Sequence, residues 1–235
     1  ACAMSTPSDL LTRYSRIRER TCALCAPLAP EDHLPQPVTE VSPPKWHLGH
    51  TSWFFEAMLL VPHRSGHRVF DARWAPLLNS YYESQGARVE RGARGQLSRP
   101  TLAQVQAYRA HVDAAMRAWL ADGQGLGGEV LALLELGLQH EQQHQELLLT
   151  DLKCILGSQP LAPAYGDTRP GVPRPIALQA EHAPQRVGQG GQAEAAAEWL
   201  AHAGGVVEVG HDPGLDAGFA FDNETPRHAV LLAPF

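Results

Sequence analysis

The sequence has few features that would place the protein in a membrane, outside the cell or on nucleic acid. Its 235 residues include only four cysteines, which suits a reducing compartment. No apolar run approaches the roughly 20 residues that span a bilayer, and the charged N-terminal stretch lacks the apolar core of a signal peptide. The net charge is −6, and the basic residues form no long block. We therefore expect a cytoplasmic protein with no membrane and no nucleic-acid partner.

Four stretches have apolar residues at helical spacing together with start and stop signals. Ser42 is expected to cap the second of these helices and Thr101 the third, because both hydroxyls directly precede an apolar periodic run. Four amphipathic helices predict a mainly α protein built as a four-helix bundle, an architecture in which metal sites form between facing helices. The predicted helices cover residues 7–27, 42–60, 101–121 and about 128–156.

The connection between the second and third predicted helices is irregular and rich in arginine. Arg88, Arg91, Arg94 and Arg99 all fall within residues 61–100. Such a cluster is commonly a solvated surface, but a guanidinium group also matches a carboxylate in bidentate geometry. The residues alone leave both interpretations open.

The composition changes after residue 157. Prolines and a Gly/Gln stretch recur over residues 158–202, which is typical of a connector with little core of its own. The segment 204–211 then alternates like a β-strand. About 30 residues are too few to close a domain, so we expect residues 203–235 to be the truncated start of a second one.

A pair of histidines, His140 and His144, dominates the fourth predicted helix. Residues four apart lie about 40° apart around a helix axis and one turn apart along it, so both rings can reach one point. The pair lies on the apolar stripe, which faces the interior. Converging neutral imidazoles are typical ligands of a divalent transition metal, although two hydrogen-bonded core histidines would give the same pattern.

A third inward histidine, His50, lies on the aromatic face of the second predicted helix and is the candidate third ligand. Three histidines on iron(II) leave positions open for substrates and dioxygen, whereas on zinc they hold a water for hydrolysis. The pair also satisfies H-E-x-x-H, the zinc-protease motif in which Glu141 would be the general base. No third ligand follows at the spacing of such proteases, so a protease is the least favoured interpretation.

Four segments occur in order along the chain: SPPKWHLGHTSWFFE (42–56), NSYYES (79–84), RGARGQLSRPT (91–101) and HEQQHQELLLTDLK (140–153). Together they resemble the iron-dependent sulfoxide synthases of ergothioneine biosynthesis. These enzymes join a DinB-like four-helix bundle to a C-terminal domain similar to the formylglycine-generating enzyme. The resemblance implies a DinB-like bundle over residues 1–157, a connector over 158–202 and the N-terminal fragment of an α+β formylglycine-generating-enzyme-like domain over 203–235.

The resemblance also implies a cofactor and a reaction. His50, His140 and His144 match the three ligands of iron(II) in that family. The implied reaction uses dioxygen to join cysteine or γ-glutamylcysteine to the imidazole ring of hercynine through a new C–S bond. A tyrosine that serves the family as proton donor is expected in a part of the second domain that lies beyond this chain.

Further site residues follow from the same resemblance. Gln143 matches a residue that lines the substrate pocket. Arg88 and Arg91 match the arginine pair that holds the carboxylates of the thiol substrate, with Arg94 as a nearby alternative. These positions imply small-molecule partners only, namely hercynine, a cysteine-type thiol and dioxygen.

Two other hypotheses stay open. One is a DinB-like metal-dependent thiol transferase or hydrolase, and the other is a truncated helical bundle that binds metal or merely folds. The sequence does not distinguish iron from zinc, the sulfur donor, the ring carbon that is attacked, or the oligomeric state.

Overall fold

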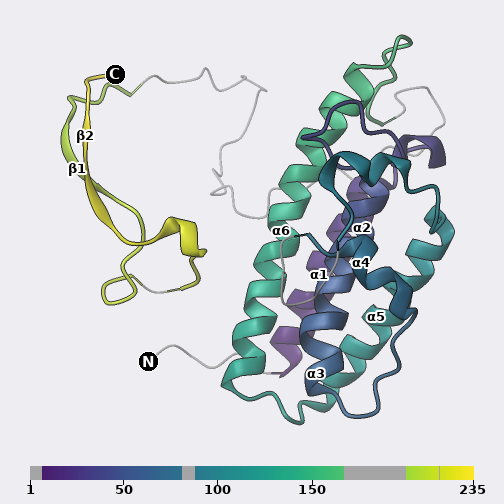
Figure 1. The fold of residues 1–235 in the computed structure, drawn as a ribbon. Coiled ribbons are helices and arrows are strands. Elements are labelled where there is room, and N and C mark those ends of the chain that lie inside the picture. Colours follow the sequence, from purple (N-terminus) through teal and green to yellow (C-terminus); the bar gives the residue numbers. More distant parts are fainter. Residues whose placement is uncertain (1–6, 81–87, 167–199, 217) are drawn as a thin grey trace, which may run out of the picture. The chain divides into compact units, whose positions relative to one another are not determined.

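The computed structural model describes residues 7–80, 88–166, 200–216 and 218–235, and the chain divides into two units, Ala1–Ala177 and Leu178–Phe235. The first unit is mainly helical, which confirms the predicted class, and the second contains a two-stranded sheet (Figure 1). In the described ranges, no helix combines the length and the apolar character needed to cross a bilayer. The predicted connector over 158–202 lies mostly outside these ranges.

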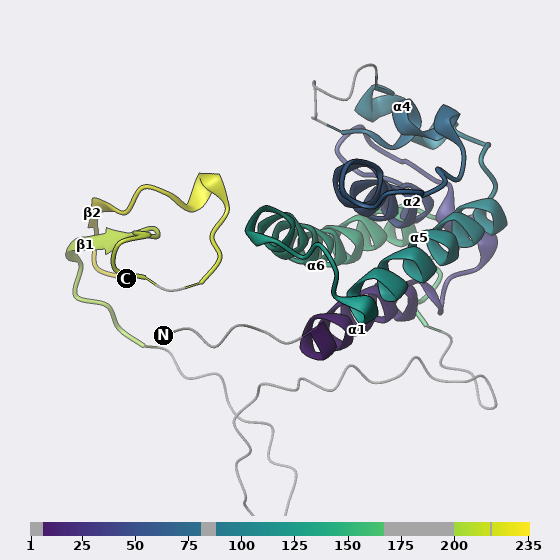
Figure 2. The same ribbon diagram turned by 90° about the horizontal axis from the view of Figure 1, so that it is seen from below.

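Four long helices form the body of the first unit. Helices α1 and α2 each pack against both α5 and α6. Seen along the helix axes, α1 and α2 occupy opposite corners of the group, and α5 and α6 occupy the other two (Figures 1 and 2). Their inner faces share one apolar core that includes Tyr14, Phe54, Phe55, Met116 and Trp119. The helices are α1 (Pro7–Cys25), α2 (Pro44–Phe54), α5 (Leu102–Asp122) and α6 (Gly128–Gly157).

The two predicted helix caps have different outcomes. Thr101 caps α5 as expected, since its hydroxyl accepts a hydrogen bond from the Gln104 amide at 3.2 Å. The prediction for Ser42 is wrong, because the residue at the N-cap of α2 is Pro43, which makes no side-chain cap. Ser42 instead donates its amide to Asp151 at 3.0 Å and accepts a hydrogen bond from Arg94 at 2.9 Å, which ties the start of α2 to α6.

Helix α2 continues without a break through the π-helical turn η2 (Phe55–Leu60) into α3 (Val61–His63). A π-helical turn contains one more residue than an α-helical turn, which rotates the following side chains around the axis. Phe54 and Phe55 are adjacent in sequence, yet both are fully buried. The turn also directs the carboxylate of Glu56 into the protein, where it is 5 % exposed.

Helix α6 approaches the α2–η2 helix closely at Gly137. A Cβ atom at this position would lie 2.8 Å from Cε1 of both Phe54 and Phe55, which is closer than such atoms pack. Glycine is therefore required for the two helices to reach their observed separation. Because Gly137 lies about one turn before His140, this contact also sets the distance between α6 and the histidine of α2.

Short helices occur in the connections between the long ones, including the region over 61–100 that was predicted to be irregular. Among them, Leu78 ends α4 and turns its carbonyl oxygen toward α2. The short elements are η1 (Pro30–His33), η3 (Ala72–Trp74), α4 (Ala75–Leu78) and η5 (Arg91–Gln96).

The second unit contains the strand predicted over 204–211. This strand, β1 (Gly205–Val209), pairs in antiparallel fashion with β2 (His228–Leu232), and Val207 lies opposite Val230. A 3₁₀ turn, η6 (Asp222–Glu224), is present in the segment between them. The side chains of both strands are largely exposed.

Candidate metal centre

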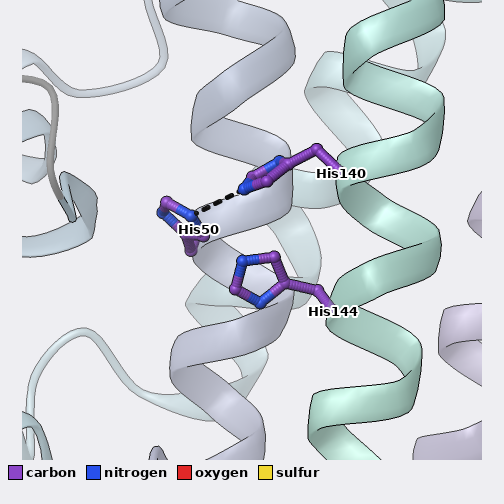
Figure 3. A group of neighbouring side chains, drawn as sticks. All are labelled: His50, His140 and His144. Atoms are coloured by element: carbon purple, nitrogen blue, oxygen red, sulfur yellow. Dashed lines mark hydrogen bonds between the residues drawn. The ribbon is translucent and has the colours of Figure 1, made fainter. Parts of the chain in front are cut away.

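The structure brings the three predicted ligands together. His50 extends from α2, and His140 and His144 extend from α6, with their rings directed toward one another (Figure 3). One ring nitrogen from each lies within 4.8 Å of the others, and Nε2 of His50 is 3.2 Å from Nε2 of His140. All three side chains are at least nine-tenths buried. This spacing is what three imidazoles that share one ion require.

The orientation of His50 is fixed by the backbone and by two indole rings. Its Nδ1 atom lies 2.6 Å from the Leu78 carbonyl oxygen, which can only accept, so Nδ1 carries the proton and donates it. The ring is stacked between Trp46 and Trp53, with centroid distances of 4.4 and 5.7 Å. The lone pair of His50 Nε2 therefore points at His140.

His144 is oriented by a relay that runs to a carboxylate. Asp151 Oδ2 accepts a hydrogen bond from His47 Nε2 at 2.9 Å, which leaves the other ring nitrogen of His47 as an acceptor. His47 Nδ1 lies 2.8 Å from His144 Nδ1, so His144 donates from Nδ1. Its Nε2 lone pair remains available for a metal. A carboxylate–histidine partner behind a ligand is a recurrent way to fix its tautomer.

The two ring nitrogens of His140 indicate which kind of partner the site suits. Its Nδ1 atom is buried and has no hydrogen-bond partner among the described residues. Its Nε2 atom faces the Nε2 lone pair of His50, so a proton or a cation must lie between the two nitrogens. Three neutral nitrogen donors directed at one point fit a divalent transition metal.

The electrostatics keep these imidazoles neutral. Burial lowers the pKa of His140 to about 4. Burial also holds the pKa of His50 and of His144 well below 6.5, and the neighbouring imidazoles and the Arg94 charge lower both further. Neutral rings are the form that binds metal, so the site is ready to bind at physiological pH.

Arg94 is the arginine of the 88–99 cluster that packs against the site. Its guanidinium carbon lies 3.4 Å from the Trp46 ring centroid, on the same indole that stacks on His50. It donates to the hydroxyls of Ser42 at 2.9 Å and Ser80 at 3.2 Å and is 6 % exposed. A fixed positive charge is therefore held beside three neutral ligands, where it favours an anionic partner.

The other predicted substrate residues lie at the surface. Arg88 donates to the Ser80 carbonyl oxygen at 3.0 Å, Arg91 donates to the Glu40 carbonyl oxygen, and both are exposed. Gln143 is exposed on α6, beside His144. Their assignment to substrate binding stays a prediction. Residues 81–84 of the NSYYES segment lie outside the described ranges.

Glu141, the potential protease base, has a structural role in this fold. Its carboxylate is fully buried and accepts hydrogen bonds from Arg18 at 2.9 Å, Arg109 at 2.5 Å and Thr21 at 2.7 Å. Burial alone would raise its pKa, but the charges of Arg109 and Arg18 lower it to about 2. A carboxylate held by two guanidinium groups is a poor proton acceptor, and the geometry therefore gives no support to the protease interpretation.

The sequence interpretation missed His47 and Asp151. Asp151 follows His144 by seven residues, which is two helical turns, so it belongs to the same stripe of α6. The available signal for Asp151 was its place on the buried stripe, two turns beyond a ligand. No basic residue lies at helical spacing to pair with this carboxylate. His47 precedes His50 by one turn and belongs to its face of α2 in the same way.

Comparison with known families adds one finding. A family model described as the DinB superfamily matches residues 13–148, more than half of the chain, and this range includes all three candidate ligands. No curated protein matches the chain.

Proposed function

This chain belongs to the DinB superfamily, and on that premise we propose that it is a metal-dependent enzyme with iron(II) held by His50, His140 and His144. Members of the superfamily are often metal-dependent enzymes. We propose further that it is a sulfoxide synthase, which joins cysteine or γ-glutamylcysteine to hercynine in ergothioneine biosynthesis. On this proposal the four helices are the DinB-like bundle, and residues 203–235 begin a formylglycine-generating-enzyme-like domain.

The observation that carries the proposal is the orientation of the three rings. Each of His50 and His144 has its second nitrogen bonded to a protein acceptor, so that its remaining lone pair is directed into the site. Three nitrogen ligands from one side of an ion leave about three positions for a thiolate, a substrate imidazole and dioxygen. The four segments similar to the sulfoxide synthases include all three ligands.

The residues around the triad suit an anionic thiol substrate. Arg94 supplies a buried positive charge against Trp46, and Arg88 and Arg91 belong to the same arginine-rich segment. We propose that these guanidinium groups bind the substrate carboxylates and favour the thiolate form of the sulfur. Trp46 and Trp53 exclude water from the stacked faces of His50 and keep the ring in place while the substrates bind.

The proposed reaction balances without a further reductant. One S–H and one imidazole C–H bond are broken, a C–S bond and an S–O bond are formed, and the second oxygen atom leaves as water with both protons. Bound iron(II) would supply the dioxygen chemistry. The chain itself supplies proximity, because it holds both substrates at one point within a buried site.

The test is incubation of the iron-loaded protein with hercynine and each thiol in air, with products measured by mass spectrometry. The expected product has the combined mass of the two substrates, less two hydrogens, plus one oxygen. His140→Ala, which removes a ligand, is expected to abolish the product and to lose the iron of this site. Formation of product by the zinc-loaded protein without oxygen would refute the proposal.

A metal-dependent thiol transferase or hydrolase is the second candidate. It is favoured by the donor set itself, since three histidines are also the ligands of catalytic zinc sites that activate water. Metal analysis of the protein purified without oxygen distinguishes the two. Zinc in the triad with oxygen-independent consumption of thiol would favour this candidate.

A further inference from the structure

We propose that the protein has a second metal site, formed by Glu56, His67 and His111, that takes Zn²⁺ or a similar divalent ion. The three residues come from different elements: the π-helical turn η2, the loop between α3 and η3, and α5. One ligand atom from each lies within 4.8 Å of the others. Glu56 follows His50 by six residues, so the two residues are separated by roughly 9 Å along the helix axis.

The distances within the cluster suit a shared ion. Nε2 of His67 donates a hydrogen bond to Oε1 of Glu56 at 3.0 Å, which a bound ion would replace, and Nε2 of His111 lies 4.0 Å from the same oxygen. The two imidazole centroids are 5.6 Å apart. Two histidines and one glutamate are the protein ligands of a recurrent class of zinc site, in which water completes the coordination.

The surroundings of the cluster hold the carboxylate in position. Oε2 of Glu56 accepts a hydrogen bond from the Tyr108 hydroxyl at 2.8 Å, and Oε1 accepts one from the Phe70 amide at 3.1 Å. Donors of this kind behind a ligating carboxylate fix its orientation.

The cluster is open on the side of α5. The side chain of His111 is 35 % exposed, whereas those of Glu56 and His67 are 7 % and 4 % exposed. An ion can therefore arrive past His111, and water can occupy the remaining coordination position. His111 now donates from Nε2 to the Arg68 carbonyl oxygen at 2.8 Å, so binding through Nε2 moves the ring proton to Nδ1 and replaces that hydrogen bond.

The test is to count the Co²⁺ ions bound by the full chain, by equilibrium dialysis without oxygen followed by metal analysis. The wild type is expected to bind two ions. His111→Gln is expected to bind one, because the amide can still donate to the Arg68 carbonyl oxygen but is not a zinc-type ligand. His63→Ala, which changes a nearby histidine of α3 outside the cluster, is expected to bind two.

Further variants make the outcome specific. His140→Ala is expected to remove one ion and leave the second, so failure at the triad and failure at this cluster are distinguishable. His67→Ala provides an independent check of the His111→Gln result. Binding of equal numbers of ions by the wild type and His111→Gln would overturn the proposal and leave the cluster as a hydrogen-bonded contact between the loop and α5.

Discussion

Replacement of Glu141 by glutamine separates a structural role of this carboxylate from a catalytic one. The change keeps the size of the side chain and removes its charge, while Arg18 and Arg109 stay buried at 1 % and 3 % exposure. Arg18 retains Asp113 as an ion-pair partner at 2.6 Å, but Arg109 loses the one carboxylate that it contacts among the described residues. Removal of one member of a buried ion pair costs about 3–5 kcal/mol, since it leaves an uncompensated charge.

The loss should be visible in thermal unfolding. A change of about 1 kcal/mol shifts the Tm of a unit of this size by about 2–4 °C, so Glu141→Gln is expected to lower the Tm by roughly 6–20 °C. Circular dichroism of the metal-free protein measures this shift, and metal analysis of the folded variant should show that the ion at the triad is retained. Glu146→Gln, which removes an exposed charge from the same helix, is the matched control.

The pH dependence of stability gives an independent check that the ionised Glu141 stabilises the fold. The pKa of Glu141 is lowered from 4.5 to about 2, so its contribution to stability is complete above pH 4.5 and is lost as the pH falls toward 2. The difference in stability between wild type and Glu141→Gln should therefore shrink over this interval. A variant with unchanged Tm but abolished turnover would refute this reasoning, because the carboxylate would then act as a base.

Three further predictions concern the geometry of the site. Gly137→Ala should destabilise the helical unit by about 1–3 kcal/mol, because the added methyl group meets Phe54 and Phe55. Urea unfolding measures this loss, and Gly157→Ala, whose methyl group meets nothing within 4 Å, is the control. Asp151→Asn should weaken metal binding at the triad about 10–100-fold, measured by competition with a chelator, while circular dichroism remains unchanged. Arg94→Lys should raise the dissociation constant of the thiol substrate, because an ammonium group cannot reproduce the planar contact with Trp46. Calorimetry measures this constant, and equal affinity in the variant would remove Arg94 from the substrate site.

The sequence was sufficient to predict the elements that carry the triad. His140 and His144 are four residues apart on a long amphipathic helix, and helix geometry alone directs both rings inward. His50 could be placed on the aromatic face of its helix for the same reason. Their convergence was a hypothesis at that point, since periodicity gives the face of each helix but not which helices are neighbours.

Other features depend on contacts between distant segments and were not predictable from local patterns. Ser42 looks like a helix cap, but it bonds Asp151 and Arg94, which are 109 and 52 residues away. The grouping of His67 with His111 depends on how a loop folds over α5. The identity of the arginine nearest the triad depends in turn on the conformation of η5, for which the sequence offers no periodic signal.

The π-helical turn η2 has a consequence for how the two clusters can change independently. His50 lies before this turn, and the loop that carries His67 lies after it. Deletion of one residue from the turn would restore regular helix and swing everything that follows by roughly 100° around the axis. A relative shortened in this way is expected to keep its histidine triad and to lose the Glu56 cluster, so the length of this turn is a marker for which relatives can bind a second ion.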